Sequence, residues 1–132
     1  MKRLFIFLSA ALALTAISCN HLTKEAKEMV GNYYIPEVSE DLPIMELNDD
    51  GNCVMRAVNP GVLTFSVEGE WNVEDDSLIM DFDRETLTFT GDSALIGEIP
   101  TRSSRYIVDF NGINLTVKHP DGLNQIYHRR PK

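Results

Sequence analysis

The chain has 132 residues, of which 20 are Asp or Glu and 12 are Lys or Arg, so its formal net charge is −8 at pH 7. A chain of this length builds one domain with a substantial hydrophobic core. Its acidic balance repels phosphate backbones and anionic lipid head groups, which argues against nucleic acid and broad membrane adhesion as partners.

The first 18 residues have the pattern of a secretory signal peptide. Lys2 and Arg3 are basic, and the thirteen residues 4–16 (LFIFLSAALALTA) carry no charge. That stretch is too short for a bilayer core about 30 Å thick, so we expect cleavage and export rather than a transmembrane helix. Removal of residues 1–18 leaves 10 basic against 20 acidic residues, a net charge of −10.

Cys19 follows directly after the expected cleavage site. Ala16 and Ser18 suit an ordinary signal peptidase. The same stretch, TAISC, resembles a bacterial lipobox, with Ala16 where Leu is usual. We favour lipidation of Cys19 with acyl chains such as palmitate, which would anchor the protein in a membrane. The resemblance to lipoproteins, with Asn20 after the cysteine, implies the outer membrane, on its periplasmic face or at the cell surface.

The mature chain is expected to begin with a polar tether, residues 19–27, followed by one domain over residues 28–132. The apolar residues Leu22, Ala26, Met29 and Val30 are spaced so that they would lie on one face of a helix. Thr23 is a candidate N-cap and Gly31 a candidate stop signal, so we expect one short helix here.

After Gly31 the hydrophobic pattern has a period of two, which is typical of strands with one buried face. The clearest segment is residues 63–73 (LTFSVEGEWNV). We expect about eight or nine strands, some of them fused or short, near residues 32–36, 43–48, 52–58, 62–74, 77–83, 85–90, 94–99, 104–110, 113–119 and 123–129.

Turn signals between these segments predict the pairing register. The turns NDDGN, VEDDSL and HPDGL lie at residues 48–52, 73–78 and 119–123, and Asn111–Gly112 predicts a two-residue hairpin. The expected pairs are Leu47 with Cys53, Met45 with Met55, Trp71 with Met80, Gly69 with Phe82, Phe110 with Ile113, Val108 with Leu115, and Tyr106 with Val117. Sequential hairpins favour an all-β, up-and-down antiparallel barrel, with a two-sheet sandwich as the alternative.

Four segments together resemble the small bacterial lipocalin-like lipoprotein domains. They are VGNYY, NDDGNCVMR, GEWNVEDDSLIMDF and QIYHRR, within a region from Lys27 to Arg130. In that group the first strand often reads Gly-x-Trp, and here it is Gly31-Asn32-Tyr33. The resemblance implies a barrel with a pocket for a small apolar ligand.

The sequence contains no recognisable catalytic or metal site. It has no Gly-x-Ser-x-Gly, and Ser103 and Ser104 lie near no histidine. In the expected register His119 and His128 are more than about 15 Å apart. The acid pairs at residues 49–50, 75–76 and 81–83 suit turns better than calcium. We therefore expect no enzyme activity, no metal and no cofactor.

The remaining candidate site is the barrel interior. The expected ligand-lining residues are Met45, Met55, Phe65, Trp71, Met80, Phe82, Phe89 and Tyr106. The alternative is that these side chains simply fill the core, although methionine suits adaptable apolar sites.

Two functional hypotheses follow. One is a barrel that binds a small hydrophobic ligand. The other is a protein-interaction module, an inhibitor or accessory subunit, whose acidic exterior would capture a basic partner.

The sequence also predicts the state of Cys53 and the position of the basic residues. Cys53 is predicted to face the core as a lone thiol if Cys19 is lipidated, or to pair with Cys19 if it is not. The basic residues near the C-terminal end of the sequence are expected in solvated loops or tails; they are Arg102, Arg105, Arg129, Arg130 and Lys132.

Overall fold

The computed structural model describes residues 22–130, so Cys19 and the expected signal peptide lie outside the described residues. One short helix, α2, spans Lys24–Glu28. The strands are β1 (Gly31–Tyr34), β2 (Met45–Leu47), β3 (Asn52–Asn59), β4 (Leu63–Glu74), β5 (Ser77–Gly91), β6 (Arg102–Phe110), β7 (Asn114–Lys118) and β8 (Asn124–Arg130). Among the described residues, no helix is long and apolar enough to cross a membrane.

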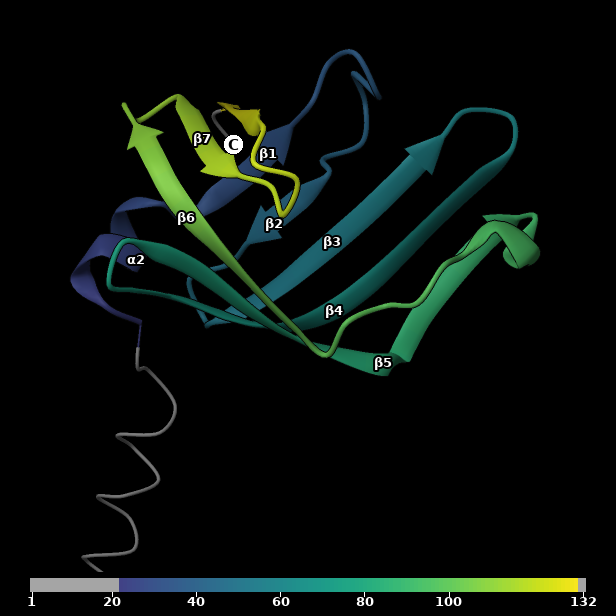
Figure 1. The fold of residues 1–132 in the computed structure, drawn as a ribbon, viewed down its shortest axis with the longest axis horizontal. Coiled ribbons are helices and arrows are strands. Elements are labelled where there is room, and N and C mark those ends of the chain that lie inside the picture. Colours follow the sequence, from purple (N-terminus) through teal and green to yellow (C-terminus); the bar gives the residue numbers. More distant parts are fainter. Residues whose placement is uncertain (1–21, 131–132) are drawn as a thin grey trace, which may run out of the picture.

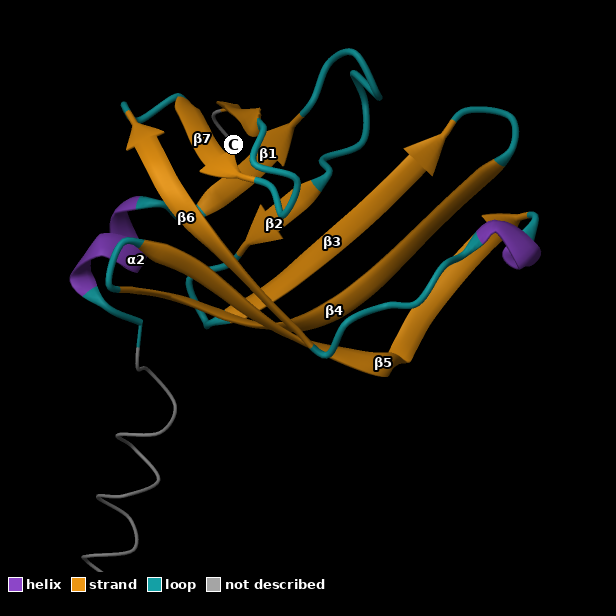
Figure 2. Ribbon diagram, viewed as in Figure 1, coloured by secondary structure: helices purple, strands orange, loops and turns teal. Residues whose placement is uncertain are grey.

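The eight strands of residues 22–130 form a closed antiparallel barrel in the order β1 to β8 (Figures 1 and 2). Each strand pairs with its neighbours in sequence, and β1 closes the barrel by pairing with β8, with Tyr33 opposite Arg129. The up-and-down barrel expected from the alternating pattern is therefore confirmed. The two-sheet sandwich is not the fold.

Turn chemistry sets most of the register as expected. Met45 lies opposite Met55, and Trp71 lies opposite Met80. The hairpin between β4 and β5 turns through Asp75 and Asp76, with φ angles of 50° and 61°. Two successive left-handed residues make the type I′ turn that matches the twist of paired strands, and Asp tolerates this region better than most residues.

The expected register of the β6–β7 hairpin is wrong. Phe110 pairs with Leu115 rather than with Ile113, and Ile107 pairs with Val117. The Asn111 side chain accepts hydrogen bonds from the backbone N–H groups of Ile113 and Asn114, which makes a longer loop than a two-residue turn. A bulge between Ile107 and Asp109 then shifts the facing of the earlier residues.

The expected strand near residues 94–99 is also wrong. Ser93–Leu95 forms a 3₁₀ turn, with the Asp92 side chain accepting from the Ala94 N–H, and an irregular connection leads to β6. The segments expected at 77–83 and 85–90 are one strand, β5. Thr86 bridges its irregular stretch, accepting from the Glu68 N–H and donating to the Asp83 carbonyl.

One end of the barrel is closed by α2, which lies at the left in Figure 1. Thr23 caps this helix as expected, and its hydroxyl also donates to the Val73 carbonyl at 2.8 Å. Leu22 and Ala26, within the range expected to form a tether, are buried against the barrel. The helix ends at Glu28, and two residues separate it from β1, which begins at Gly31.

Arg129 fastens this closed end, which corrects its expected place in a solvated tail. Its guanidinium donates to the carbonyl oxygens of Gly112, Glu28 and Val30, at 2.9, 2.9 and 3.0 Å. Arg130 likewise lies in β8, with its guanidinium carbon 4.0 Å from the centre of the Tyr34 ring. Both arginines therefore join segments that are far apart in the sequence.

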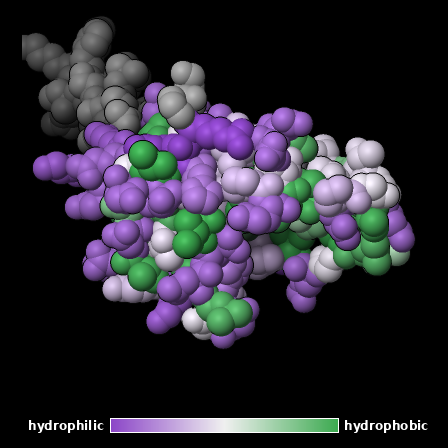
Figure 3. All heavy atoms as spheres, turned by 90° about the horizontal axis from the view of Figure 1, so that it is seen from above, coloured by the Kyte–Doolittle hydropathy of each residue, from purple (hydrophilic) through white to green (hydrophobic). Residues whose placement is uncertain are grey.

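The other end of the barrel is open because its strands differ in length. The three-residue β2 covers only the first part of β3, and β6 pairs with β5 only from Ser77 to Asp81. The far parts of β3, β4 and β5 extend beyond the rest of the barrel, toward the right in Figure 1. Hydrophobic residues are visible at this projecting end, among other places, in Figure 3. The side chains of Val62, Phe89 and Leu95 are exposed.

Gly69 allows the close approach of β4 and β5. A Cβ at this position would lie 2.0 Å from the Asp81 carbonyl oxygen, a backbone atom that cannot rotate away. We expect Gly69→Ala to lower the free energy of unfolding by about 2 kcal/mol or more, measured by urea denaturation. Gly97→Ala is the matched control, since a Cβ there meets nothing within 4 Å. Equal stability of the two variants would contradict the close approach.

Candidate ligand cavity

A cavity of about 270 Å³ opens inside the barrel between the closed end and the projecting strands. Every strand except β1 contributes to its wall, and residues 97–100 of the β5–β6 connection cover part of it. Most of the wall is apolar: Met45, Met55, Ala57, Phe65, Val67, Leu78, Met80, Phe82, Ile99 and Val117. An apolar cavity of this kind, with a few polar groups, is the usual form of a small-molecule site.

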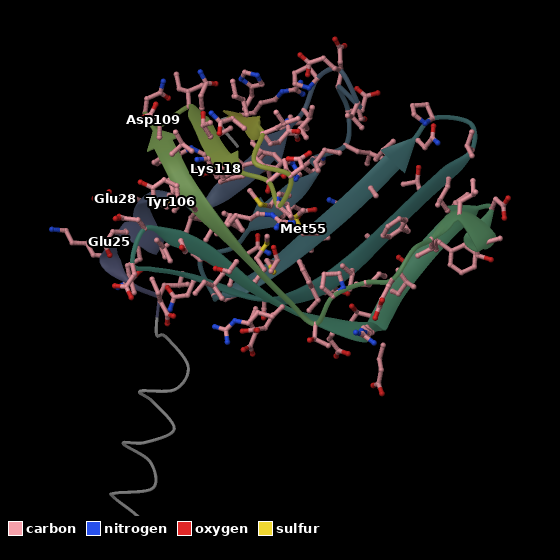
Figure 4. All side chains as sticks on the ribbon, in the orientation of Figure 1. Glu25, Glu28, Met55, Tyr106, Asp109 and Lys118 are labelled. Carbon is pink, nitrogen blue, oxygen red and sulfur yellow. The ribbon has the colours of Figure 1, made fainter. Side chains whose placement is uncertain are left out.

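Five of the eight residues expected to line the interior do line this cavity. They are Met45, Met55, Phe65, Met80 and Phe82. Two of them, Met45 and Met55, form one cross-strand pair, and Met55 lies inside the barrel in Figure 4. The sulfur-rich part of the wall is therefore brought together by the β2–β3 hairpin.

The other three expected residues lie elsewhere. Trp71 is packed in the core near the closed end, where its ring nitrogen donates to the Asn48 carbonyl at 2.8 Å. Phe89 pairs with Phe65 but lies farther out on β5 and is 51% exposed. Tyr106 is 54% exposed and lies on the far side of β6 from Met55 in Figure 4. The bulge in β6 explains why the Tyr106 side chain points outward. The extra residue moves the side chains that precede it to the opposite face of the sheet.

Polar side chains at the cavity were missed by the sequence reasoning. They are Arg56, Glu98, Ser103, Arg105, His119 and Tyr127. Arg105 lies opposite the buried Leu78, and Ser103 opposite Met80. Because paired residues share a face of the sheet, both point inward. The VEDDSL turn sets the register of β4 with β5 only. The irregular connection between β5 and β6 contains no turn signal that would place Ser103 and Arg105 inside.

Arg105 and Tyr127 interact electrostatically across the interior. Burial raises the pKa of the Tyr127 hydroxyl, and the positive charge of Arg105 opposes part of that rise. Arg56, in contrast, is already engaged, since it forms an ion pair with Glu46 and donates to the Pro43 carbonyl at 3.1 Å. The expected place of Arg105 in a solvated loop is therefore wrong. The cavity combines an apolar wall with a cationic group held inside it.

Cys53 lies in the core with an exposed fraction of 0%. Burial raises the pKa of its thiol to about 12, and the charges of Asp81 and Glu70 add to the rise. A thiol of this kind is protonated and inert at neutral pH. The Cys53 thiol would have to become exposed before it could form a disulfide with another cysteine.

The raised thiol pKa predicts a loss of stability in alkali. The unfolded chain releases this proton near pH 9.0 and the folded chain only near pH 12, so the unfolded state binds fewer protons in between. Stability is therefore complete below pH 9 and falls as the pH rises toward 12. Between about pH 8 and pH 10, the free energy of unfolding of Cys53→Ala is expected to fall by about 1 kcal/mol less than that of the native chain, measured by urea denaturation. Parallel pH profiles for the two chains would contradict this.

The two histidines of the described residues, His119 and His128, belong to no metal-binding cluster. Asn114 lies opposite His128 as expected, and their side chains are joined at 2.6 Å. His119 is partly buried and lines the cavity. Within residues 22–130, no three His, Cys, Asp or Glu side chains lie close enough together to hold a metal ion. Compared with protein-family models, curated proteins and solved structures, the chain has no significant match.

Proposed function

We propose that this protein is a lipid-anchored envelope protein whose lipocalin-like barrel binds a small hydrophobic ligand. The single observation that carries the proposal is the cavity of about 270 Å³, apolar over most of its wall and open at one end. A barrel whose side chains only filled the core would leave no such space. The volume lies just below the range of typical ligand pockets, roughly 300–1,000 Å³, which favours a small ligand.

Filling the cavity is expected to abolish binding. Ala57 lines the cavity near its open end, and its small side chain leaves space that tryptophan would occupy. We expect Ala57→Trp to weaken binding of the neutral apolar dye N-phenyl-1-naphthylamine at least tenfold, measured by fluorescence titration. Thr88→Trp is the matched control, because Thr88 pairs with Ser66 and contributes no side chain to the cavity.

Native mass spectrometry of gently extracted protein provides the complementary test. A bound small molecule in the native chain, absent from Ala57→Trp, would support the proposal. Absence of both dye binding and a co-purified molecule would overturn it.

The anchor is supported by the sequence TAISCN around Cys19. Intact-mass measurement of the mature protein, with and without reductant, separates the alternatives. A mass increased by acyl chains supports the anchor. A mass of the unmodified chain from Cys19, with or without a disulfide, overturns it.

A second candidate function, capture of a basic protein, is favoured by one surface feature. On the outer face of β4 and β5, Glu68 lies opposite Asp83 and Glu70 opposite Asp81, and all four are exposed. Like charges directly opposite each other destabilise a sheet, and a basic partner would relieve the repulsion. If this function is correct, the double variant Glu68→Gln/Glu70→Gln would lose binding to a basic enzyme such as lysozyme at low salt. No binding by the native chain would overturn it.

A further inference from the structure

The guanidinium of Arg105, which lines the cavity, forms no ion pair with any residue that the structure describes. Within residues 22–130, the ion pairs join Arg56 to Glu46 and Arg102 to Asp81. The guanidinium of Arg105 takes part in neither pair, and in none of the side-chain hydrogen bonds that these residues form. It nevertheless points inward and is partly buried. Placing a cation in an apolar cavity costs free energy unless an opposite charge lies beside it. An anionic ligand group next to Arg105 would offset this cost.

Hydroxyl groups lie beside the same part of the wall. Ser103 precedes Arg105 by two residues on β6, so the two side chains share a face, and Ser103 is 7% exposed. Tyr127 enters from β8, opposite the fully buried Leu115. An arginine fork and two hydroxyl donors match the two oxygen atoms of a carboxylate.

Apolar side chains surround these donors on the inner side. Leu78 and Met80, opposite Arg105 and Ser103, are 1% and 3% exposed, and both line the cavity with Val67 and Met45. The one carboxylate at the cavity is Glu98, which lies exposed in the β5–β6 connection. The interior therefore has a cationic polar site and an apolar remainder.

We propose that the ligand is an amphiphile with a carboxylate head group, bound to Arg105, Ser103 and Tyr127, and with an alkyl tail against Leu78, Met80 and Val67. This inference rests on the proposed ligand-binding function and specifies its chemistry. A cavity of about 270 Å³ favours a chain on the order of ten carbons, such as a medium-chain fatty acid. A neutral or cationic head group would leave the arginine without compensation.

Three ligands with the same tail test the head group: decanoate, 1-decanol and decylamine. Each is titrated at concentrations below micelle formation, by displacement of N-phenyl-1-naphthylamine or by calorimetry. We expect decanoate to bind at least tenfold more tightly than decanol, with decylamine weakest, because charge-assisted hydrogen bonds form only with the carboxylate.

Arg105→Gln is the decisive variant. It keeps a polar side chain of similar reach, and we expect it to weaken decanoate binding about tenfold while leaving decanol unchanged. Arg102→Gln, on the same strand but paired with Asp81 at the surface, is the matched control and should change neither. Circular dichroism of both variants establishes that they are folded.

The outcomes separate this inference from the proposed function. If the dye and decanol bind, but decanoate binds no better than decanol, the carboxylate proposal is overturned and the hydrophobic-ligand function stands. If Arg105→Gln weakens decanoate and decanol equally, the role of Arg105 in head-group recognition is overturned. If neither the dye nor any of the three amphiphiles binds, the proposed function itself fails.

Discussion

Replacement of Trp71 by alanine is expected to lower the free energy of unfolding by about 4 kcal/mol. The indole is 2% exposed, and its removal would leave a large cavity in the core near the closed end. Its ring N–H donates to the Asn48 carbonyl, and its backbone N–H donates to the Gly51 carbonyl, both in the β2–β3 turn. The ring therefore joins β4 to that turn as well as filling the core.

Two further variants separate the contributions of Trp71. Trp71→Phe keeps most of the packing and loses the ring hydrogen bond, so we expect a smaller loss of about 1–2 kcal/mol. Phe89→Ala removes an aromatic ring from the same sheet where it is half exposed, and should cost less than about 1 kcal/mol. Urea denaturation followed by far-UV circular dichroism serves all three, since Trp71 is the only tryptophan. Equal losses for Trp71→Ala and Phe89→Ala would refute this placement of the indole.

Arg129→Met is expected to cost about 3 kcal/mol, the second largest effect. The change keeps the length of the side chain and removes the donors that bind the Gly112, Glu28 and Val30 carbonyls. It also removes a cation whose guanidinium carbon lies 5.1 Å from the centre of the Phe110 ring. The end of α2, the start of β1 and the β6–β7 loop would lose their common link.

The neighbouring arginine supplies the control for Arg129. Arg130 contacts the Tyr34 ring and the Glu40 carbonyl from an exposed position, so Arg130→Met should cost less than about 1 kcal/mol. Arg129→Lys retains the charge, but a single ammonium group cannot reach all three carbonyls, and we expect an intermediate loss. Thermal unfolding of the three variants tests this order. A loss for Arg130→Met as large as that for Arg129→Met would show that the fork geometry is unimportant.

The barrel could be predicted from the sequence because two local signals agree along most of the chain. Alternation places Leu63, Val67 and Trp71 on one face, and the Asp75–Asp76 turn sets the partners of β4 in β5 from Glu74 back to Glu68, before the register shifts. In the β2–β3 hairpin, and in the β4–β5 hairpin near its turn, the expected register is correct, as for Met45 opposite Met55 and Trp71 opposite Met80. Agreement between the hydrophobic pattern and the turn residues is what allows a series of hairpins to be predicted from the sequence.

The β6–β7 hairpin was misread because a bulge carries no clear sequence mark. One extra residue between Ile107 and Asp109 reverses the facing of the residues before it, so Tyr106 was placed inside and Arg105 outside. The same error hid the cationic group of the cavity.

The cavity itself depends on how far each strand reaches, which hydrophobic periodicity does not reveal. The short β2 and the long β5 leave the interior open at one end. The role of Arg129 could not be predicted for another reason. The local sequence around a basic residue looks the same whether its side chain is solvated or donates to distant backbone carbonyls, as Arg129 does.

The attachment of α2 to the closed end has a consequence for how the protein would sit on a membrane. Thr23 is held by Val73 and Asn72, and Cys19 precedes Leu22 by only three residues, which span roughly 11 Å at full extension. An acyl anchor at Cys19, as proposed above, would therefore hold the helical end against the lipid surface and turn the mouth of the barrel away from it. A ligand would then enter and leave through the aqueous space, so the protein would act as a carrier facing its surroundings rather than as an extractor of lipids from its own bilayer.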